Sequence, residues 1–265
     1  MNTLERKIDD AWPDLGVRLR VLKLRWRRDV TGRLITHLVR PGDVVVDIGA
    51  NRGVYTALLS RRVGSGGRVH AIEPVPAMED RLRTLARHRG NITVHTLALS
   101  DATGTTSLQL PVFHGHAIDA LATVGRVTTA PSVSVDVDVR TLDDLMADER
   151  GRISFVKCDV EGHEHHVLRG GLRVIREHRP VIVVEIEQRH REDPIWRTFA
   201  MLTDLGYSAY CLGEDGVRDL ETFDVQRDQL SYISDGFVPY GMPAGYVNDF
   251  LFVPSERELP DGLTR

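Results

Sequence analysis

The chain has 265 residues, of which 42% are hydrophobic and 27% charged, and its formal net charge is −4. This ordinary globular composition excludes the disordered, fibrous and membrane-spanning classes, since no segment approaches the roughly 18 consecutive apolar residues of a spanning helix. Only Cys158 and Cys211 are present, which excludes a disulfide framework and a multi-cysteine zinc or cluster site. We expect a cytoplasmic protein, because the first residues also lack the apolar centre of a signal peptide.

Residues 1–39 predict a helical extension with a basic face. Residues 1–40 hold ten Lys or Arg against five Asp or Glu. Apolar residues recur there at helical spacing: Leu15, Leu19, Leu22, Trp26, Val30, Leu34 and Leu38. We interpret the segment as helices docked on the core with a solvated arginine face, rather than as a patch for an anionic membrane or nucleic acid. The expected partners therefore include no nucleic acid and no membrane span, and the oligomeric state stays open.

From residue 40 onward, apolar strands alternate with helices. Strands are expected over 43–49, 68–74, 92–100, 153–160 and 181–187, and helices over 54–63, over 78–90 and through Leu168, Leu172 and Ile175. Continuous apolar strands separated by helices indicate a parallel sheet covered on both faces. Segments 207–213 and 246–254 are typical of a closing antiparallel pair. We therefore expect one doubly wound α/β domain over 40–255 and a tail over 256–265.

The first strand ends in "DIGANRG", where Gly49 and Gly53 allow the backbone to pass close to a ligand. The start of the next helix offers free N–H groups to an anionic or polar group. A nicotinamide-binding fingerprint needs further glycines at positions 51 and 54, which are Asn51 and Val54 here. The turn therefore predicts a ligand site, and it argues against a dehydrogenase.

An acidic residue closes the second strand at the spacing of a ribose-binding group. Glu73 lies 24 residues after Gly49, and its carboxylate can accept both hydrogen bonds from a ribose diol. Ser100 and Asp101 follow the third strand and could frame an adenine, although this stretch is equally typical of a simple turn. A ribose-binding acid without a pyrophosphate turn suits S-adenosylmethionine, whose cationic sulfonium is compatible with a nearby Asp47.

Several segments together resemble the FkbM family of S-adenosylmethionine-dependent methyltransferases. They are "VVDIGANRGVYT", "HAIEPVP", "LALSDATG", "VRTLDDLM", "KCDVEGHEHHVLRGG" and "DFLFVP", in this order over residues 40–255. The resemblance implies a seven-stranded sheet of order 3-2-1-4-5-7-6 whose last strand is antiparallel. It also implies cofactor contacts at Asp47, Gly49, Asn51, Gly53, Glu73, Ser100 and Asp101. Family members methylate hydroxyl groups on natural products and glycans.

Charged residues crowd the end of the fourth strand, in "KCDVEGHE" at 157–164. Lys157, Asp159 and Glu161 alternate at the strand period of two and are expected to share one side. An aliphatic hydroxyl needs a positioned base during attack, and Asp159, Glu161 and His163 are the candidates. The structural alternative is that Asp159 and Glu161 pair with Lys157 and cap the next helix.

A metal remains an open alternative at the same edge of the sheet. Glu185 and Glu187 end the fifth strand, so two adjacent strand ends supply four carboxylates, of which Mg²⁺ accepts one or two. The "HEHH" run lacks the His spacing of a zinc helix, so zinc is not favoured. We assign no residue as a metal ligand, and Mg²⁺ stays an optional second cofactor.

Two long segments are candidates for selecting the acceptor. Residues 111–137 contain His114 and His116, and 132–140 alternate like an additional strand. The second segment, 228–246, contains the aromatic residues Tyr232, Phe237, Tyr240 and Tyr246, which could form pocket walls or pack on the sheet edge.

The sequence thus predicts an O-methyltransferase that uses S-adenosylmethionine on a hydroxyl of a small natural product or saccharide. The alternatives are an NAD(P)-dependent oxidoreductase and a non-catalytic module that binds S-adenosylmethionine. The acceptor and the methylated position are not predicted.

Overall fold

The structure is a computed structural model that describes residues 29–113, 116–117, 123–124, 132–214, 216–233, 243–259 and 263. Side chains are described for these residues except within 111–131. The helices expected before residue 29, the side chains of His114 and His116, and the residues Phe237 and Tyr240 lie outside the described part. The division into an extension, a domain and a tail therefore stays a prediction.

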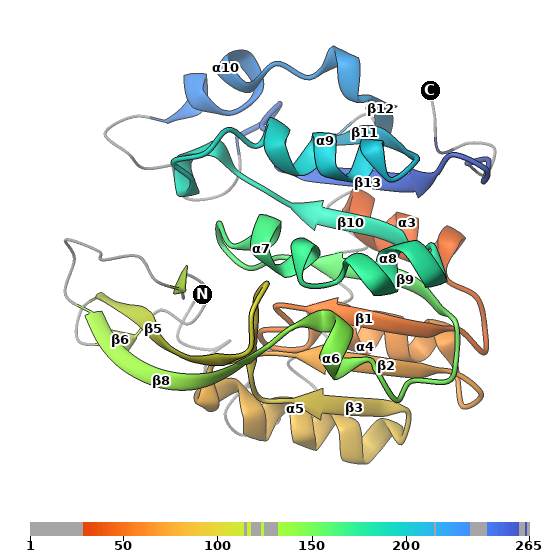
Figure 1. The fold of residues 1–265 in the computed structure, drawn as a ribbon, viewed down its shortest axis with the longest axis vertical. Coiled ribbons are helices and arrows are strands. Elements are labelled where there is room, and N and C mark those ends of the chain that lie inside the picture. The colour runs from red at the N-terminus through yellow and green to blue at the C-terminus, as the bar shows by residue number, and fades with distance from the viewer. Residues whose placement is uncertain are drawn as a thin grey trace.

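The main sheet of the described residues has eight strands in the order β12-β11-β13-β10-β9-β1-β2-β3 (Figure 1). Their bounds are β1 Val44–Ile48, β2 Arg68–Ile72, β3 Ile92–His95, β9 Ile153–Cys158, β10 Val181–Glu185, β11 Tyr207–Gly213, β12 Gly216–Asp219 and β13 Asp249–Pro254. Strands β3, β2, β1, β9 and β10 pair in parallel, and β13 is antiparallel to both β10 and β11. The predicted order 3-2-1-4-5-7-6 is confirmed, and β12 adds an eighth strand as a hairpin with β11.

Helices cover both faces of this sheet. The helical bounds are α3 Val30–Leu38, α4 Val54–Val63, α5 Pro76–Arg89, α6 Leu142–Leu145, α7 Glu164–Arg169, α8 Leu172–His178, α9 Trp196–Asp204 and α10 Val225–Asp228, with short 3-10 turns at η2 Gln188–His190, η3 Leu220–Thr222 and η4 Leu230–Tyr232. Alternate residues of β1 enter different cores, because side chains alternate across a strand. Val45 packs with α3 and α4, whereas Val46 packs with α6 to α9. None of the helices in the described residues has the length and apolar character needed to span a bilayer.

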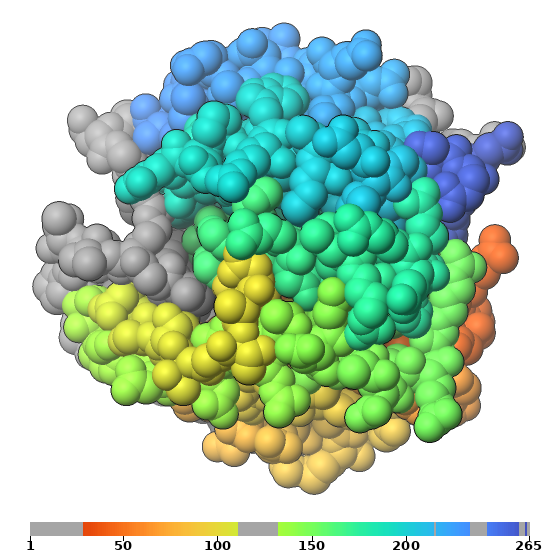
Figure 2. Space-filling model, in the orientation of Figure 1, coloured from red at the N-terminus to blue at the C-terminus, as the bar shows by residue number. Residues whose placement is uncertain are grey.

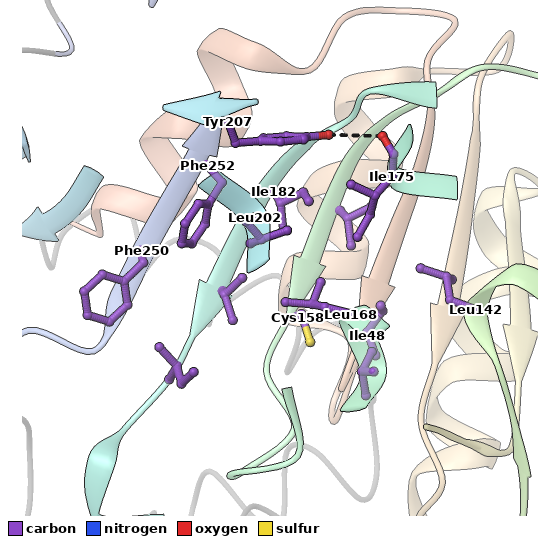
Figure 3. Close-up of a cluster of buried hydrophobic side chains, with 14 of the residues drawn as sticks. Ile48, Leu142, Cys158, Leu168, Ile175, Ile182, Leu202, Tyr207, Phe250 and Phe252 are labelled. Atoms are coloured by element: carbon purple, nitrogen blue, oxygen red, sulfur yellow. Dashed lines mark hydrogen bonds between the residues drawn. The ribbon is translucent and has the colours of Figure 1, made fainter. Parts of the chain in front are cut away.

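The larger core lies under α6 to α9 (Figure 3). Phe250 and Phe252 of β13 meet Phe199 of α9 with ring centroids 4.6 and 5.7 Å apart. The Tyr207 hydroxyl donates a hydrogen bond of 3.3 Å to the carbonyl of Ile175. Cys158 is fully buried in this core, and both cysteines are free.

A second, smaller sheet flanks the carboxyl ends of the parallel strands. It contains β4 Ala98–Leu99, β5 Gly104–Phe113, β6 His116–Ala117, β7 Thr123–Val124 and β8 Ser132–Arg140, in the order β4-β8-β5-β6 with β7 on β5. The additional strand predicted over 132–140 is confirmed. Figure 2 shows β5 and β8 as a lobe at the left of the molecule. Their buried side chains, Leu108, Leu110, Val137 and Val139, pack on Val75 and Met78 of the α5 start.

Three predicted elements have different bounds. The strand expected over 92–100 is divided, because β3 ends at His95 and Ala98–Leu99 pairs instead with β8. The helix expected through Leu168 and Ile175 is two helices, α7 and α8, separated by Gly170 and Gly171. Strand β9 ends at Cys158, so the period-two argument does not extend to Glu161, which follows in a turn.

The carboxyl ends of β1 and β9 lie in close contact. The Asp159 N–H donates a 3.0 Å hydrogen bond to the carbonyl of Ile48. Gly49 follows with φ at 76°, and a Cβ atom at this position would overlap the carbonyl oxygen of Asp159. A glycine is therefore required here by the packing of two backbones as well as by its dihedral angle.

We predict that Gly49→Ala destabilises the protein strongly. A side chain at Gly42 meets the same dihedral penalty, since its φ is 89°, but nothing lies within 4 Å of its Cβ position. Gly42→Ala is therefore the matched control, with an expected loss of about 1–2 kcal/mol from left-handed strain. Gly49→Ala should cost more than about 4 kcal/mol, measured as the free energy of unfolding in urea. Equal losses in the two variants would contradict the backbone contact.

Candidate active site

A cavity of about 170 Å³ lies at the carboxyl ends of β1, β2 and β9. It is closed on one side by Leu108 of β5 and by the segment 97–99. Six of the ten predicted site residues line it: Gly49, Asn51, Glu73, Asp159, Glu161 and His163. The other four predicted site residues do not line the cavity; they are Asp47, Gly53, Ser100 and Asp101. The cavity thus joins the turn after β1 to the charged segment after β9, although 110 residues separate Gly49 from Asp159.

Glu73 lies at the end of the cavity nearest β2, with 7% of its surface exposed. Its carboxylate accepts backbone N–H hydrogen bonds from Asn51 at 2.8 Å and from Val75 at 3.0 Å. Burial raises the pKa of Glu73 to about 7 against the opposing effect of these two donors. Each carboxylate oxygen retains acceptor capacity, so Glu73 can still receive hydroxyl donors from the cavity.

Gly53 and Asn51 shape the start of α4. Gly53 is the helix N-cap with φ at 78°, and a Cβ there would come within 3.0 Å of both Leu82 and Leu85 of α5. Asn51 has φ at 47°, a left-handed conformation that asparagine tolerates. The turn therefore has packing reasons for its sequence.

Asp47 lies beneath the cavity, on the α4 face of β1, with 1% of its surface exposed. Its Oδ2 accepts a 2.6 Å hydrogen bond from the Thr56 hydroxyl, and Oδ1 has no hydrogen-bond partner within the described part of the chain. Burial raises the pKa of Asp47, and the Lys157 ammonium opposes that rise. Lys157 is the residue of β9 paired with Asp47 in the sheet.

Ser100 and Asp101 turn toward α7 instead of lining the cavity. The Ser100 hydroxyl lies 2.9 Å from Nε2 of His163. Asp101 pairs with Nδ1 of His166 at 3.0 Å and with the Arg169 guanidinium at 2.6 Å. These contacts connect the turn that follows β4 to His163 and α7. The adjacent cavity wall consists of Leu97, Ala98 and Leu99.

Asp159 forms an ion pair with Lys157, whose Nζ lies 3.0 Å from the carboxylate. The Asp159 side chain is 27% exposed toward the cavity, whereas that of Lys157 is 3% exposed. One part of the structural alternative, the pairing of Asp159 with Lys157, is therefore present. The other parts are wrong, since Glu161 lies against His190 and α7 has no side-chain N-cap hydrogen bond. The pairing does not remove Asp159 from the cavity, because the carboxylate has acceptor sites that a single ammonium contact leaves free.

Glu161 sits in a left-handed turn with φ at 51°, followed by Gly162 at 99°. Gly162 packs on η2, since a Cβ there would lie 2.7 Å from the carbonyl oxygen of His190. This approach brings Oε2 of Glu161 to 3.4 Å from Nε2 of His190. Burial, followed by repulsion from Asp159 and Glu187, raises the pKa of Glu161 to about 8. His190 was not among the predicted site residues, because no local sequence pattern connects it to Glu161.

His163 lines the cavity and is the N-cap residue of α7. Burial lowers its pKa to about 4, and the nearby His166 acts in the same direction. The two imidazole rings stack with centroids 4.7 Å apart. His163 is therefore neutral near pH 7, and its Nε2 is held by Ser100.

The remaining strand-end carboxylates have protein partners. Oε1 of Glu185 accepts a 2.6 Å hydrogen bond from Asn248, and Glu187 pairs with Arg189 and accepts from the Tyr246 hydroxyl. Among the described residues, no group of three or more His, Cys, Asp or Glu is arranged to hold a metal ion. The residues present do not fit a Mg²⁺ site, because Asp159 and Glu187 each already pair with a cation, Lys157 and Arg189 respectively, and Glu185 is bound by Asn248.

The aromatic residues predicted as acceptor walls have a structural role where they are described. Tyr246 is 7% exposed, and its ring meets that of Tyr232 edge to face at 5.7 Å. Neither residue lines the cavity.

The strand order, the cavity at the carboxyl ends and a family match together define a methyltransferase dependent on S-adenosylmethionine. The chain belongs to the FkbM family, since the model of the methyltransferase FkbM domain matches residues 47–209. Both the family and the enzyme class expected from the sequence are confirmed. A nicotinamide-dependent oxidoreductase is no longer supported.

Several characterised proteins are similar to this chain. It is 29% identical over 182 residues to the hexuronic acid methyltransferase AglP of Haloferax volcanii, a match covering 67% of each chain. It is 33% identical over 159 residues to the 31-O-demethyl-FK506 methyltransferase FkbM of Streptomyces tacrolimicus, covering 50% of this chain and 60% of that protein. The methyltransferase sdnD of Sordaria araneosa is 28% identical over 224 residues, covering 73% of this chain and 78% of sdnD.

Among solved structures, the fold is similar to that of a methyltransferase FkbM from Methylobacillus flagellatus. The TM-score is 0.45 at 21% identity, over 80% of this chain and 52% of that one. Aeropyrum pernix fibrillarin with bound S-adenosylmethionine has a TM-score of 0.45 at 15% identity, over 72% and 71% of the two chains.

We predict that Glu73→Gln flattens the pH dependence of stability. The pKa of Glu73 is about 7 in the folded state and 4.5 without burial, so between these values the folded state binds more protons than the unfolded state. The free energy of unfolding therefore falls as pH rises through this window, and the Glu73 contribution is about 3 kcal/mol. Between pH 4.5 and 7.5, the free energy of unfolding in urea should fall less in the variant than in the wild type.

Asp80→Asn, on the exposed side of α5, is the control. It should retain the wild-type dependence of the free energy of unfolding on pH. A Glu73→Gln slope equal to that of the wild type would contradict the raised pKa.

Proposed function

We propose that the chain transfers a methyl group from S-adenosylmethionine to a hydroxyl of a small natural product or saccharide. The observation that carries this proposal is one cavity lined both by Glu73 and the Gly49 turn and by Asp159, Glu161 and His163. The first group has the chemistry to hold a nucleoside, and the second has the chemistry to receive a proton. Family membership supplies the reaction class.

The residues present fit the cofactor at this cavity. Glu73 would accept the two ribose hydroxyls, because it lines the cavity and each of its oxygens, already bound to one backbone N–H, has an acceptor site left. The apolar segment 97–99 with Leu108 would cover an adenine ring. The turn from Gly49 to Asn51 and the first N–H groups of α4 would face the methionine carboxylate. The cofactor supplies a methyl group on a sulfonium, which is strongly electrophilic.

The charged segment after β9 would position the acceptor and take its proton. A hydroxyl becomes a competent nucleophile as its proton leaves, so a base within hydrogen-bond reach accelerates the step. Glu161 is the proposed base, since burial and its acidic neighbours raise its pKa to about 8. Asp159, held by Lys157, would accept a hydrogen bond from the same hydroxyl and orient it. His163 is a neutral hydrogen-bonding wall.

The proposed reaction is a single displacement at the methyl carbon. The acceptor oxygen forms a bond to the methyl carbon as the carbon–sulfur bond breaks, and the hydroxyl proton moves to the Glu161 carboxylate. Alignment of oxygen, carbon and sulfur supplies a large share of the acceleration. His190 lies beside this carboxylate, with its Nε2 3.4 Å from Oε2 of Glu161. No step requires a metal ion.

The class of acceptor rests on the similar proteins. Their names specify a hexuronic acid in one case and demethylated FK506 in another. The chain covers 67% and 60% of those two proteins, so we carry over only the broad class, a saccharide or a natural product with a hydroxyl group.

We predict that calorimetry detects stoichiometric binding of S-adenosylhomocysteine and none of NADH. The physical reason is that the turn has a ribose-binding acid but lacks the glycines that admit a pyrophosphate. Glu73→Ala should weaken the binding of S-adenosylhomocysteine, whereas Glu79→Ala, on the surface of α5, is the matched control and should leave it unchanged. Binding of NADH alone would refute the proposed function.

We predict that Asp159→Asn and Glu161→Gln retain binding of S-adenosylhomocysteine and lose turnover by about a hundredfold or more, the usual effect of a positioned base. In the wild type, kcat should rise with pH as Glu161 loses its proton near pH 8. This pH dependence should disappear in Glu161→Gln and persist in Asp159→Asn. Methyl transfer from labelled S-adenosylmethionine to a panel of saccharides and polyketides provides the assay. An unchanged pH profile in Glu161→Gln would remove that residue from the role of base.

A further inference from the structure

Lys157 lies among carboxylates contributed by four neighbouring strands. Asp47 is in β1, Asp159 directly follows β9, Glu185 ends β10 and Asp249 begins β13. Glu185 and Asp249 are paired in the sheet, and Asp47 is paired with Lys157. All four carboxylates interact electrostatically with the Lys157 ammonium, which is the cation that they share.

Helices α3 and α4 cover this cluster on the side away from the cavity. The Lys157 Nζ lies 4.8 Å from the centre of the Tyr55 ring, an arrangement in which the ring stabilises a cation. The hydroxyl of Thr31 donates to Asp249 at 3.1 Å, and that of Thr56 donates to Asp47 at 2.6 Å. Lys157 is 2% exposed. Only the Asp159 side of the cluster reaches the cavity.

The charge state of Lys157 follows from its surroundings. Burial by itself lowers the pKa of the ammonium, but the surrounding carboxylates raise it by more, so the net shift is upward. An ammonium offers three N–H donors, and one of them reaches Asp159 at 3.0 Å. Lys157 is therefore a permanent positive charge on the α3 and α4 side of Asp159.

A divalent ion that bound Asp159 and its neighbouring carboxylates would need the position that the Lys157 ammonium occupies. Mg²⁺ requires carboxylate oxygens that converge on one point and leave room for water and substrate oxygens. Here the Lys157 ammonium already pairs with Asp159, the Thr56 hydroxyl binds Oδ2 of Asp47, and Asn248 binds an oxygen of Glu185. The Lys157 side chain thus supplies a positive charge where adjacent strand ends would otherwise bring several negative charges together.

We propose that Lys157 is a built-in counter-ion that replaces a divalent metal at this edge of the sheet and holds the Asp159 carboxylate at the cavity. Lys157 is a positioning residue, since it acts on the acceptor only through Asp159. The kinetic part of this inference rests on the proposed methyl transfer, whereas the metal-binding part does not.

The first experiment measures metal binding and metal dependence in the wild-type protein. Calorimetric titration with Mn²⁺ and with Mg²⁺ should show no stoichiometric binding, with or without S-adenosylhomocysteine. Methyl transfer in the presence of EDTA should equal that with added Mg²⁺. Stoichiometric binding of Mn²⁺, or activity that EDTA removes and Mg²⁺ restores, would overturn the proposal.

The second experiment tests whether Lys157 acts through Asp159. Lys157→Met should lower kcat by about a hundredfold, the scale of losing a positioned carboxylate, while affinity for S-adenosylhomocysteine is retained. Lys157→Arg keeps the charge and should recover part of the rate. Arg33→Met, which removes an exposed charge from α3, is the control and should leave kcat unchanged.

A double variant keeps the test decisive if Lys157→Met alone does not fold. Lys157→Met combined with Asp159→Asn removes both members of the ion pair, so the one carboxylate in direct contact with the ammonium is removed together with it. Its kcat should equal that of Asp159→Asn, because Lys157 has nothing left to position. A further loss in the double variant would contradict action through Asp159. Failure of the wild type to bind S-adenosylhomocysteine would instead refute the proposed function and leave the metal titration valid.

Discussion

The contact between the carboxyl ends of β1 and β9 is the constraint on which the site depends. The Asp159 N–H donates a hydrogen bond to the Ile48 carbonyl. The Asp159 carbonyl oxygen lies so close to Gly49 that a side chain at position 49 has no room. This contact places the turn that begins α4 beside the charged segment that precedes α7. The residues proposed to bind the nucleoside and those proposed to accept the proton therefore line one cavity, although neither segment could form it alone.

The same contact concentrates negative charge, and the fold compensates for it in two ways. Some carboxylates have a cation: Asp159 pairs with Lys157, and Glu187 pairs with Arg189. Others bind backbone N–H groups, as Glu73 does. Where these partners are insufficient, burial raises the pKa, to about 7 for Glu73 and about 8 for Glu161. A carboxyl with a raised pKa is a better proton acceptor once ionised, so incomplete compensation at Glu161 serves the proposed chemistry.

Much of the site was accessible to sequence reasoning because its signals are local. Glycine in a strand-to-helix turn and an acidic residue at a strand end have direct structural consequences, and Gly49 and Glu73 lie at the cavity as expected. The reason for the glycine was only partly foreseen. Gly49 admits the backbone of β9, and Gly53 admits the leucines of α5, so both are required by packing before any ligand is considered.

By itself, the sequence determined the alternation of strands and helices, the edge of the sheet proposed to bind the ligand and the identity of the acidic residues there. These depend on the period of apolar residues and on turn chemistry within about ten residues, which a chain expresses locally. Only the tertiary structure decided which strand-end side chains meet. It turned Ser100 and Asp101 onto α7, brought His190 to Glu161 and buried Lys157 among four carboxylates. Those contacts join residues far apart in the chain, and their geometry is set by how strands pair and helices pack, which no local pattern encodes.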